Sequence, residues 1–319
     1  ELHRSRAPVP ARHRLPALAR YAHLDLGGGE QRPVGYVEAS HGCAHRCRHC
    51  PLPVVYGGRF RIVDADVVVA DVAQLVSLGA RHLTFGDPDF LNGPQHSLRV
   101  VRAVHERFPE LTFDCTAKVS HILDHRGLWP ALAAAGCLFV VSAFESANDA
   151  ILERLDKGHT TAEAAEAVAL LRGHGIEIRP SWLPFTPWTT VDDVADIVDF
   201  VIGHDLVGNV DPVQYTIRLL LPEGSLLLPR DDVQAHLGAY DPGRLTWAWA
   251  AADPAADDLQ ARLAALVEAG VAAGDSPIAT FLDVNAAVAQ AAGRPPLAAG
   301  AIPAGSIAGR PRLTEPWFC

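Results

Sequence analysis

Short apolar strand patterns alternate with amphipathic helix patterns between residues 34 and 221, and this alternation constrains the fold most. Expected strands cover 34–40, 81–87, 111–119, 137–146, 176–185 and 210–222, and expected helices cover 66–79, 97–109, 121–136, 161–175 and 189–205. Apolar strands separated by helices form a parallel sheet covered by helices. Six such units predict an α/β fold, a partial (β/α)6 barrel, because eight units close the full barrel.

The composition of the chain changes on both sides of this region, which suggests four segments. Residues 1–33, rich in Arg, Pro and Ala, are an N-terminal extension expected to have little regular structure. Residues 34–221 form the partial barrel, and residues 222–293 form a C-terminal helical region with one clear helix at 257–274. Residues 294–319, rich in Pro, Gly and Ala at first, form a flexible linker and a tail that ends on Cys319.

Charge and cysteine content limit the classes of partner and the compartment. A net charge of -10 and a pI near 5.8 argue against nucleic acid as a partner. No apolar run reaches the roughly 20 residues that span a bilayer, and we see no signal peptide, so we expect no membrane partner. The 6 cysteines do not form a spaced disulfide framework, which favours a cytoplasmic protein with reduced thiols. Because the first residue is Glu1, we expect an N-terminal trim.

Three cysteines follow the first expected strand in a C-x3-C-x2-C spacing: Cys43, Cys47 and Cys50. In parallel α/β folds, chemistry is located on the loops after the strand ends. A [4Fe–4S] cluster normally takes four thiolates, so three thiolates leave one iron open to a small molecule. The alternatives are a structural zinc site completed by a histidine at position 41, 45 or 49, and a disulfide. No second C-x2-C supports the zinc alternative.

The cysteine spacing, its position after "GYVEAS" and the following β/α units resemble the radical SAM superfamily. The resemblance implies a [4Fe–4S] cluster on Cys43, Cys47 and Cys50, with S-adenosylmethionine (SAM) on the open iron. It also implies that one electron, supplied by a donor such as flavodoxin or ferredoxin, splits a C–S bond of SAM. The residue before the third cysteine is often aromatic in this family, and here it is His49.

Polar residues at the ends of later strands are candidates for binding SAM. In "FGDPDFLNG", Gly86 allows close approach of the backbone, and Asp87 or Asp89 accepts protons from the SAM ammonium group; the alternative is a surface turn. The stretch also resembles cobalamin-dependent relatives, but we expect no cobalamin domain within the first 33 residues. The other candidates are Lys118 and Ser120, Ser142, Glu145 and Ser146, and Arg179 and Ser181.

Several of these positions also have an ordinary structural explanation. Glu145 at a buried strand end requires a partner, which makes a salt bridge the alternative to cofactor binding. In "LDKGHTT", Lys157 and His159 either touch the substrate or start a solvated helix. The side chains that we expect in the core are Trp182, Trp188, Cys115 and Cys137.

The C-terminal "RLTEPWFC" resembles the end of the CUAEP/CCAEP-tail radical SAM proteins. The stretches "GCAHRCRHCP", "VYGGRF", "FGDPDFLNGP", "LDKGHT" and "PFTPWTT" are also similar to that family, so the resemblance covers most of the chain. It implies that a cysteine or selenocysteine follows Cys319 in the natural chain. Paired soft thiol or selenol groups bind soft centres such as trivalent arsenic.

Related cysteine-tail enzymes build arsenic–carbon bonds in arsinothricin biosynthesis, with SAM as the aminocarboxypropyl donor. The resemblance therefore implies a small-molecule or metalloid substrate, with Cys319 as a catalytic residue. Three alternatives stay open. The first is hydrogen abstraction from a peptide or small molecule by a 5'-deoxyadenosyl radical, and the second is a non-catalytic metal-binding module. The third is a protein that binds thiophilic elements through its tail without cleaving SAM.

Overall fold

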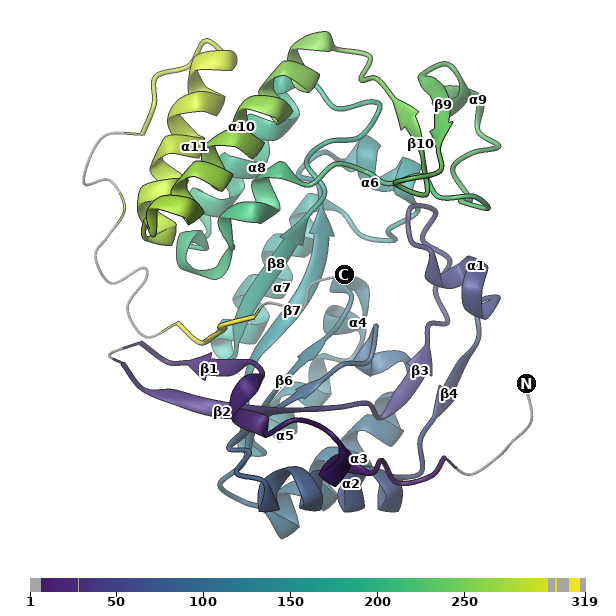
Figure 1. The fold of residues 1–319 in the computed structure, drawn as a ribbon, viewed down its shortest axis with the longest axis vertical. Helices are drawn as coiled ribbons and strands as arrows, with labels where there is room; N and C mark the ends of the chain where they lie inside the picture. Colours follow the sequence, from purple (N-terminus) through teal and green to yellow (C-terminus); the bar gives the residue numbers. More distant parts are fainter. Residues whose placement is uncertain (1–6, 28, 298–301, 303–309, 316–319) are drawn as a thin grey trace.

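A curled sheet forms the centre of the protein (Figure 1). The computed structural model describes residues 7–27, 29–297, 302 and 310–315, so Cys319 lies outside the described residues. The strand order is β11-β1-β2-β5-β6-β7-β8. The strands are β1 (His23–Asp25), β2 (Gln31–Val37), β5 (His82–Phe85), β6 (Thr112–Thr116), β7 (Cys137–Glu145), β8 (Glu177–Trp182) and β11 (Arg312–Leu313). Strands β2 and β5 to β8 are parallel, which confirms the expected partial barrel.

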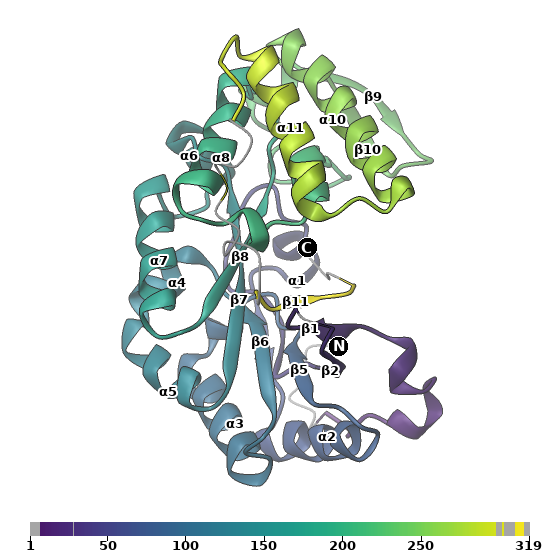
Figure 2. The same ribbon diagram turned by 90° about the vertical axis from the view of Figure 1, so that its left-hand side faces the viewer.

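Helices cover the convex face of this sheet, while β1 and β11 lie on its open, concave side (Figure 2). The covering helices are α2 (Ala65–Ser77), α3 (Pro94–Arg107), α4 (Val119–Asp124), α5 (Trp129–Ala134), α6 (Asp149–Leu155), α7 (Thr161–Gly173) and α8 (Val191–Gly203). α8 lies within the expected helix 189–205, and Thr190 and Asp193 form a reciprocal capping box at its N-terminus. No helix within the described ranges is long and apolar enough to cross a membrane.

The two faces of the parallel sheet bury different sets of side chains. Residues such as Leu83, Cys115 and Val140 point to the helices and join the main core. On the concave side, a second apolar cluster fills the lower part of the barrel. Its buried members are Ala22, Leu24, Val34, Phe139, Val141 and Leu313. Because Leu24 belongs to β1 and Leu313 to β11, both ends of the chain close the barrel interior.

The sixth expected strand, 210–222, differs from the prediction. It contains the 3-10 helix η6 (Pro212–Thr216) and only one parallel bridge to the barrel, between Phe185 and Arg218. Pro212 has no N–H to donate to a sheet. The Gln214 side chain instead accepts the backbone N–H of Trp182 at 3.0 Å, so it takes the place of a strand carbonyl.

The segments outside the barrel are more ordered than the sequence predicted. Within 7–33 lie two short 3-10 helices, η1 (Arg12–Arg14) and η2 (Leu18–Arg20), and strand β1. The C-terminal region contains α9 (Asp231–Gln234), α10 (Pro254–Ala273), α11 (Pro277–Ala291) and an unexpected hairpin of β9 (Leu237–Asp241) and β10 (Thr246–Trp249). The expected helix 121–136 is split into α4, η4 (Arg126–Leu128) and α5, with Pro130 in the first turn of α5.

Candidate active site

The cysteine loop follows β2 and is framed by a small antiparallel pair. Strands β3 (Ser40–Gly42) and β4 (Phe60–Ile62) form its base, and α1 (Leu52–Tyr56) follows the last cysteine. Gly42, with φ of +81°, enters the loop; a Cβ atom there would lie 2.4 Å from the Arg59 carbonyl oxygen. A glycine is therefore required at this turn.

The three thiols of this loop lie close enough to influence one another electrostatically. Cys43 and Cys47 are buried and Cys50 is half-buried, and all three are free thiols. Burial raises the pKa of Cys50 to about 11, and the charges of Cys47 and Cys43 add to the rise. Burial likewise raises the pKa of Cys43. Neighbouring thiols in such a place hold a proton unless a cation compensates them, and bound iron provides that compensation. The donor set therefore fits a cluster held by three cysteines.

Both lysines of the chain lie beside these thiols, although the sequence contains 27 Lys and Arg residues. Lys118, just after β6, places its Nζ atom 3.6 Å from the Cys47 Sγ atom. Lys157 is fully buried; burial lowers its pKa, but the charges of Glu145 and Cys47 outweigh burial and raise it above its usual value. The position after an expected strand points to Lys118, while Lys157 is open between a substrate contact and a solvated helix start. The scarcity of lysine in the chain is a further signal for both.

Glu145 connects this positive charge to the cysteine loop. It ends β7 in the left-handed region, with φ of +65°, which is uncommon for a residue with a side chain. Its Oε1 atom lies 3.1 Å from Lys157 Nζ and 2.9 Å from His49 Nε2. Burial opposes ionisation of Glu145, but Lys157 and His49 prevail and hold its pKa well below the usual range. His49 thus faces a carboxylate and is largely buried.

His159 completes the buried polar group at this end of the barrel. Neither ring nitrogen has a hydrogen-bond partner among the described residues. Burial and the Lys157 charge lower the pKa of His159 to about 4, so the ring is neutral at neutral pH. A neutral, unsatisfied imidazole beside the cysteine loop is able to accept or donate a hydrogen bond to a bound ligand.

The turn after β5 lies under the cysteine loop. Asp87 accepts hydrogen bonds from the Ala39 N–H at 2.9 Å and from the Ser40 hydroxyl at 2.5 Å, and burial raises its pKa to about 6. The space beside Gly86 is filled by the ring of Tyr36, because a Cβ atom at Gly86 would lie 2.0 Å from that ring. Both residues thus have protein neighbours that fix the loop, and their expected role toward SAM remains a prediction.

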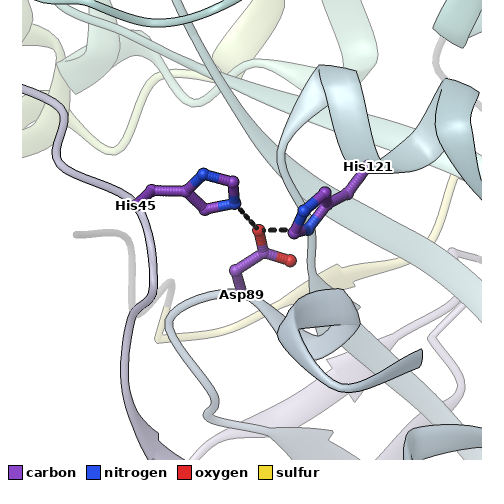
Figure 3. A group of neighbouring side chains, drawn as sticks. All are labelled: His45, Asp89 and His121. Carbon is purple, nitrogen blue, oxygen red and sulfur yellow. Dashed lines mark ion pairs between the residues drawn. The ribbon is translucent and has the colours of Figure 1, made fainter. Parts of the chain in front are cut away.

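Asp89 lies beyond this turn and contacts two histidines (Figure 3). His45, from the cysteine loop, and His121, from α4, both approach its Oδ2 atom. From the sequence alone, His45 is an alternative zinc ligand beside the cysteines and Asp89 is a candidate SAM contact, whereas no local motif points to His121.

Two expected site residues lie elsewhere. In β7, Phe139 and Val141 belong to the concave cluster and Val140 to the main core, so the alternation of the strand places Ser142 on the helix side. Its buried hydroxyl has no partner among the described residues. Arg179 points into the barrel but pairs with Asp211 at 3.0 Å and donates to the Pro311 carbonyl at 3.3 Å. It therefore anchors the C-terminal segment. The residues expected in the core are indeed buried: Cys115, Cys137, Trp182 and Trp188.

A cavity of about 180 Å³ opens beside the third cysteine. Its lining includes His49, Cys50 and Pro51 from the loop, and Pro222 and Glu223 from the segment after η6. A small ligand in this space would touch the Cys50 corner of the site.

A parallel half-barrel with three converging thiols at the carboxyl ends of its strands defines an iron–sulfur enzyme class. The model of the radical SAM superfamily matches residues 37–201, which include all three cysteines and the parallel strands β5 to β8. The chain belongs to the radical SAM superfamily, whose enzymes use a [4Fe–4S] cluster and SAM.

Individual relatives agree with this assignment. An uncharacterized methyltransferase of Pyrococcus horikoshii is 23% identical over 216 residues, which are 67% of this chain and 44% of that protein. The bacteriochlorophyllide d C-12(1)-methyltransferase of Chlorobaculum tepidum is 28% identical over 44% of this chain and 31% of its own length. The chain thus spans less than half the length of these relatives.

A solved structure shares the fold. The cobalamin-dependent SAM radical enzyme OxsB, with aqua-cobalamin and SAM bound, matches with a TM-score of 0.62 and 14% identity. The match covers 74% of this chain and 41% of that chain. At this identity the similarity supports the half-barrel fold.

Proposed function

We propose that this enzyme cleaves SAM reductively and transfers the aminocarboxypropyl group to a soft, thiol-bound acceptor such as trivalent arsenic. Cys43, Cys47 and Cys50 hold the cluster, which when bound supplies the electron that breaks the sulfonium C–S bond. One electron divides SAM into methylthioadenosine and an aminocarboxypropyl radical. The radical forms the carbon–arsenic bond as one arsenic–sulfur bond breaks, and a second electron from the same donor reduces the released thiyl radical to a thiolate. A flavodoxin or ferredoxin is the proposed electron donor.

The direction of β11 supports the proposal that the C-terminal thiol holds the acceptor near the cluster. Strand β11 is antiparallel to β1, and β1 is antiparallel to β2, so β11 runs in the same direction as β2. The chain therefore leaves β11 toward the barrel end where β2 delivers the cysteine loop. Thr314 donates its N–H to His23, which pairs with Pro33, four residues before the end of β2 at Val37.

The number of residues between Glu315 and Cys319 is sufficient for the proposed reach of the Cys319 thiol. Cys319 is four residues beyond Glu315. An extended segment of four residues spans up to about 14 Å, similar to the length of β2 that remains beyond Pro33. We propose that the Cys319 thiol holds the soft acceptor at the mouth of the barrel.

We propose that the residues of the barrel end balance the charges of the cluster and orient SAM. The positive side chains of Lys118 and Lys157 offset the negative charge of the thiolate-bound cluster. We propose that Glu145, ionised and fixed by Lys157, orients the cofactor, while neutral His159 supplies a hydrogen bond. Asp87, Gly86 and Asp89 are proposed as the surrounding wall on the β5 side.

The identity of the SAM products tests this proposal. The protein is reconstituted anaerobically, mixed with dithionite and SAM, and its products are identified by mass spectrometry, with and without trivalent arsenic. We expect methylthioadenosine above the non-enzymatic background and an arsenic–carbon product that is lost in Cys319→Ser. A control with Cys115→Ser, a thiol buried in β6, should retain both products.

The second candidate is hydrogen abstraction by a 5'-deoxyadenosyl radical from a peptide or small molecule. The cavity of about 180 Å³ beside Cys50 favours it, because a small substrate could be held there close to the cofactor. In the same assay, 5'-deoxyadenosine as the dominant product would establish this candidate and contradict the aminocarboxypropyl branch.

A further inference from the structure

His45, Asp89 and His121 form a compact group outside the three thiols (Figure 3). Asp89 Oδ2 lies 2.8 Å from His121 Nδ1 and 3.3 Å from His45 Nε2. These three atoms all lie within 4.8 Å of one another. They come from three separate elements: the cysteine loop, the turn after β5, and α4. The three residues are far apart in the sequence, so the fold brings their side chains together.

Asp89 is held so that one oxygen is directed at the two rings. Its side chain is 1% exposed, and its Oδ1 atom accepts the N–H of Leu91 at 3.0 Å. The remaining oxygen, Oδ2, is therefore the only ligand atom that Asp89 offers to the rings.

The contacts around Oδ2 are close but are not aligned as hydrogen bonds. His45 Nε2, Asp89 Oδ2 and His121 Nδ1 are all buried, and none has a properly oriented hydrogen-bond partner among the described residues. Buried polar atoms without a partner are rare in proteins, and they occur where an ion binds. Three converging donor atoms, two nitrogens and one carboxylate oxygen, are an arrangement that can hold a metal ion.

The donor set narrows the kind of ion. Two imidazole nitrogens and one carboxylate oxygen suit zinc and divalent iron, whereas magnesium and calcium prefer oxygen alone. Ligands about 2.0–2.1 Å from a tetrahedral zinc are separated by roughly 3.3 Å, close to the two contacts measured here. We propose that His45, Asp89 and His121 bind one divalent transition-metal ion, with zinc as the expected occupant and a fourth position open to water.

An ion bound to His45 would restrict the movement of the cysteine loop. It lies between Cys43 and Cys47, so an ion bound to it ties the middle of the cysteine loop to β5 and α4. The His45 and His121 side chains are 24% and 17% exposed, which leaves a path for the ion and for a water ligand. This site is separate from the zinc alternative weighed from the sequence, because its ligand set contains no thiol.

The test uses the full chain with its cluster in place, so that iron occupies Cys43, Cys47 and Cys50. The protein is treated with a mild chelator, and zinc is titrated against a fluorescent competitor, with iron and sulfide measured in parallel. We expect one zinc equivalent in addition to the cluster. Cobalt(II) in the same site should give the d–d bands of a nitrogen–oxygen set without a thiolate charge-transfer band.

His121→Phe is the main variant, because it removes the ligand nitrogen and keeps an aromatic ring against His45, whose centroid lies 4.4 Å away. We expect its zinc affinity to fall at least roughly 100-fold while its iron and sulfide content stays unchanged. His125→Phe, whose ring neighbours His121 at 5.4 Å, is the matched control and should bind zinc as the wild type does. His121→Ala gives a second measurement if the larger ring disturbs α4.

Three results would overturn the proposal. The first is the absence of zinc beyond the cluster in the wild-type protein. The second is unchanged zinc affinity in both His121 variants. The third is a thiolate charge-transfer band with cobalt(II), which would place the ion on the cysteines instead.

Discussion

Lys118 is the residue whose charge acts most directly on the cluster sulfurs. Its Nζ atom lies 3.6 Å from Cys47 Sγ, and a nearby positive charge favours the more negative, reduced cluster. We expect Lys118→Gln to lower the midpoint potential by on the order of 50 mV, the effect of one partly solvated charge at this distance. A redox titration followed by EPR measures it. Arg126→Gln, a change of the same charge at an exposed residue that pairs with Glu166, is the control.

Asp87 makes the stability of the fold depend on pH. Its folded pKa of about 6 lies above the ordinary 3.8, so the folded protein binds this proton more tightly than the unfolded chain does. The stabilisation from that proton is complete below pH 3.8 and is lost as the pH rises through about 6. The loss amounts to roughly 2–3 kcal/mol.

Asp87→Asn removes this proton equilibrium. We expect the free energy of unfolding of the variant, relative to wild type, to improve between pH 4 and pH 7. Chemical denaturation at several pH values measures both proteins. A difference between the two that does not change with pH would show that Asp87 is not the group responsible.

At the residue level, the sequence identifies the cysteine motif as the candidate cluster site but gives little about its surroundings. The C-x3-C-x2-C spacing is local, so no knowledge of the fold was needed to identify Cys43, Cys47 and Cys50. The side of the sheet on which a strand residue lies depends on register and bulges, and a bulge between Ala143 and Glu145 changes the alternation in β7. The sequence could not show that Ser142 faces the helices while Glu145 turns toward the cysteine loop.

At the element level, the strand–helix alternation predicted the barrel because each unit buries one apolar face. The same alternation does not predict strands whose pairing partner is far away in the sequence. Strand β11 consists of Arg312 and Leu313, and it forms only because β1 offers it a free edge some 290 residues earlier in the chain. No local pattern marks such a short strand.

Leu313 is the residue that fixes β11 to the barrel. It is 8% exposed and packs with Leu24 and Phe139 in the interior cluster. We expect Leu313→Ala to destabilise the fold by about 2 kcal/mol, the lower range for a buried leucine. Leu220 is 65% exposed, so the control variant Leu220→Ala should change the free energy of unfolding by less than about 0.5 kcal/mol.

Leu313→Ala also separates the two parts of the proposed function, which are SAM cleavage and transfer to the soft acceptor. With β11 loosened, trypsin should cut faster at Arg312, and transfer to the soft acceptor should fall more than SAM cleavage does. If transfer and cleavage fall equally, β11 supports the whole barrel and does not position the tail.

At the level of the whole molecule, positively charged lysine side chains lie at the end of the barrel that carries the three thiols. The chain is acidic overall, with a net charge of -10, yet both of its lysines lie beside the three thiols. A cluster with thiolate ligands is negative, so this placement lowers the free energy of the loaded site. The acidic remainder of the surface does not offset it, because distant exposed charges are screened.

Cys43, Cys47 and Cys50 are proposed to hold a cluster whose open iron receives SAM. The most direct measurement is the EPR spectrum of the anaerobically reconstituted, dithionite-reduced protein before and after SAM is added. We expect the signal of a reduced [4Fe–4S] cluster, with about four irons per chain, and a change in its g-values when SAM binds. A reduced cluster whose spectrum is unaffected by SAM, or a chain that takes up no iron, would contradict the claim.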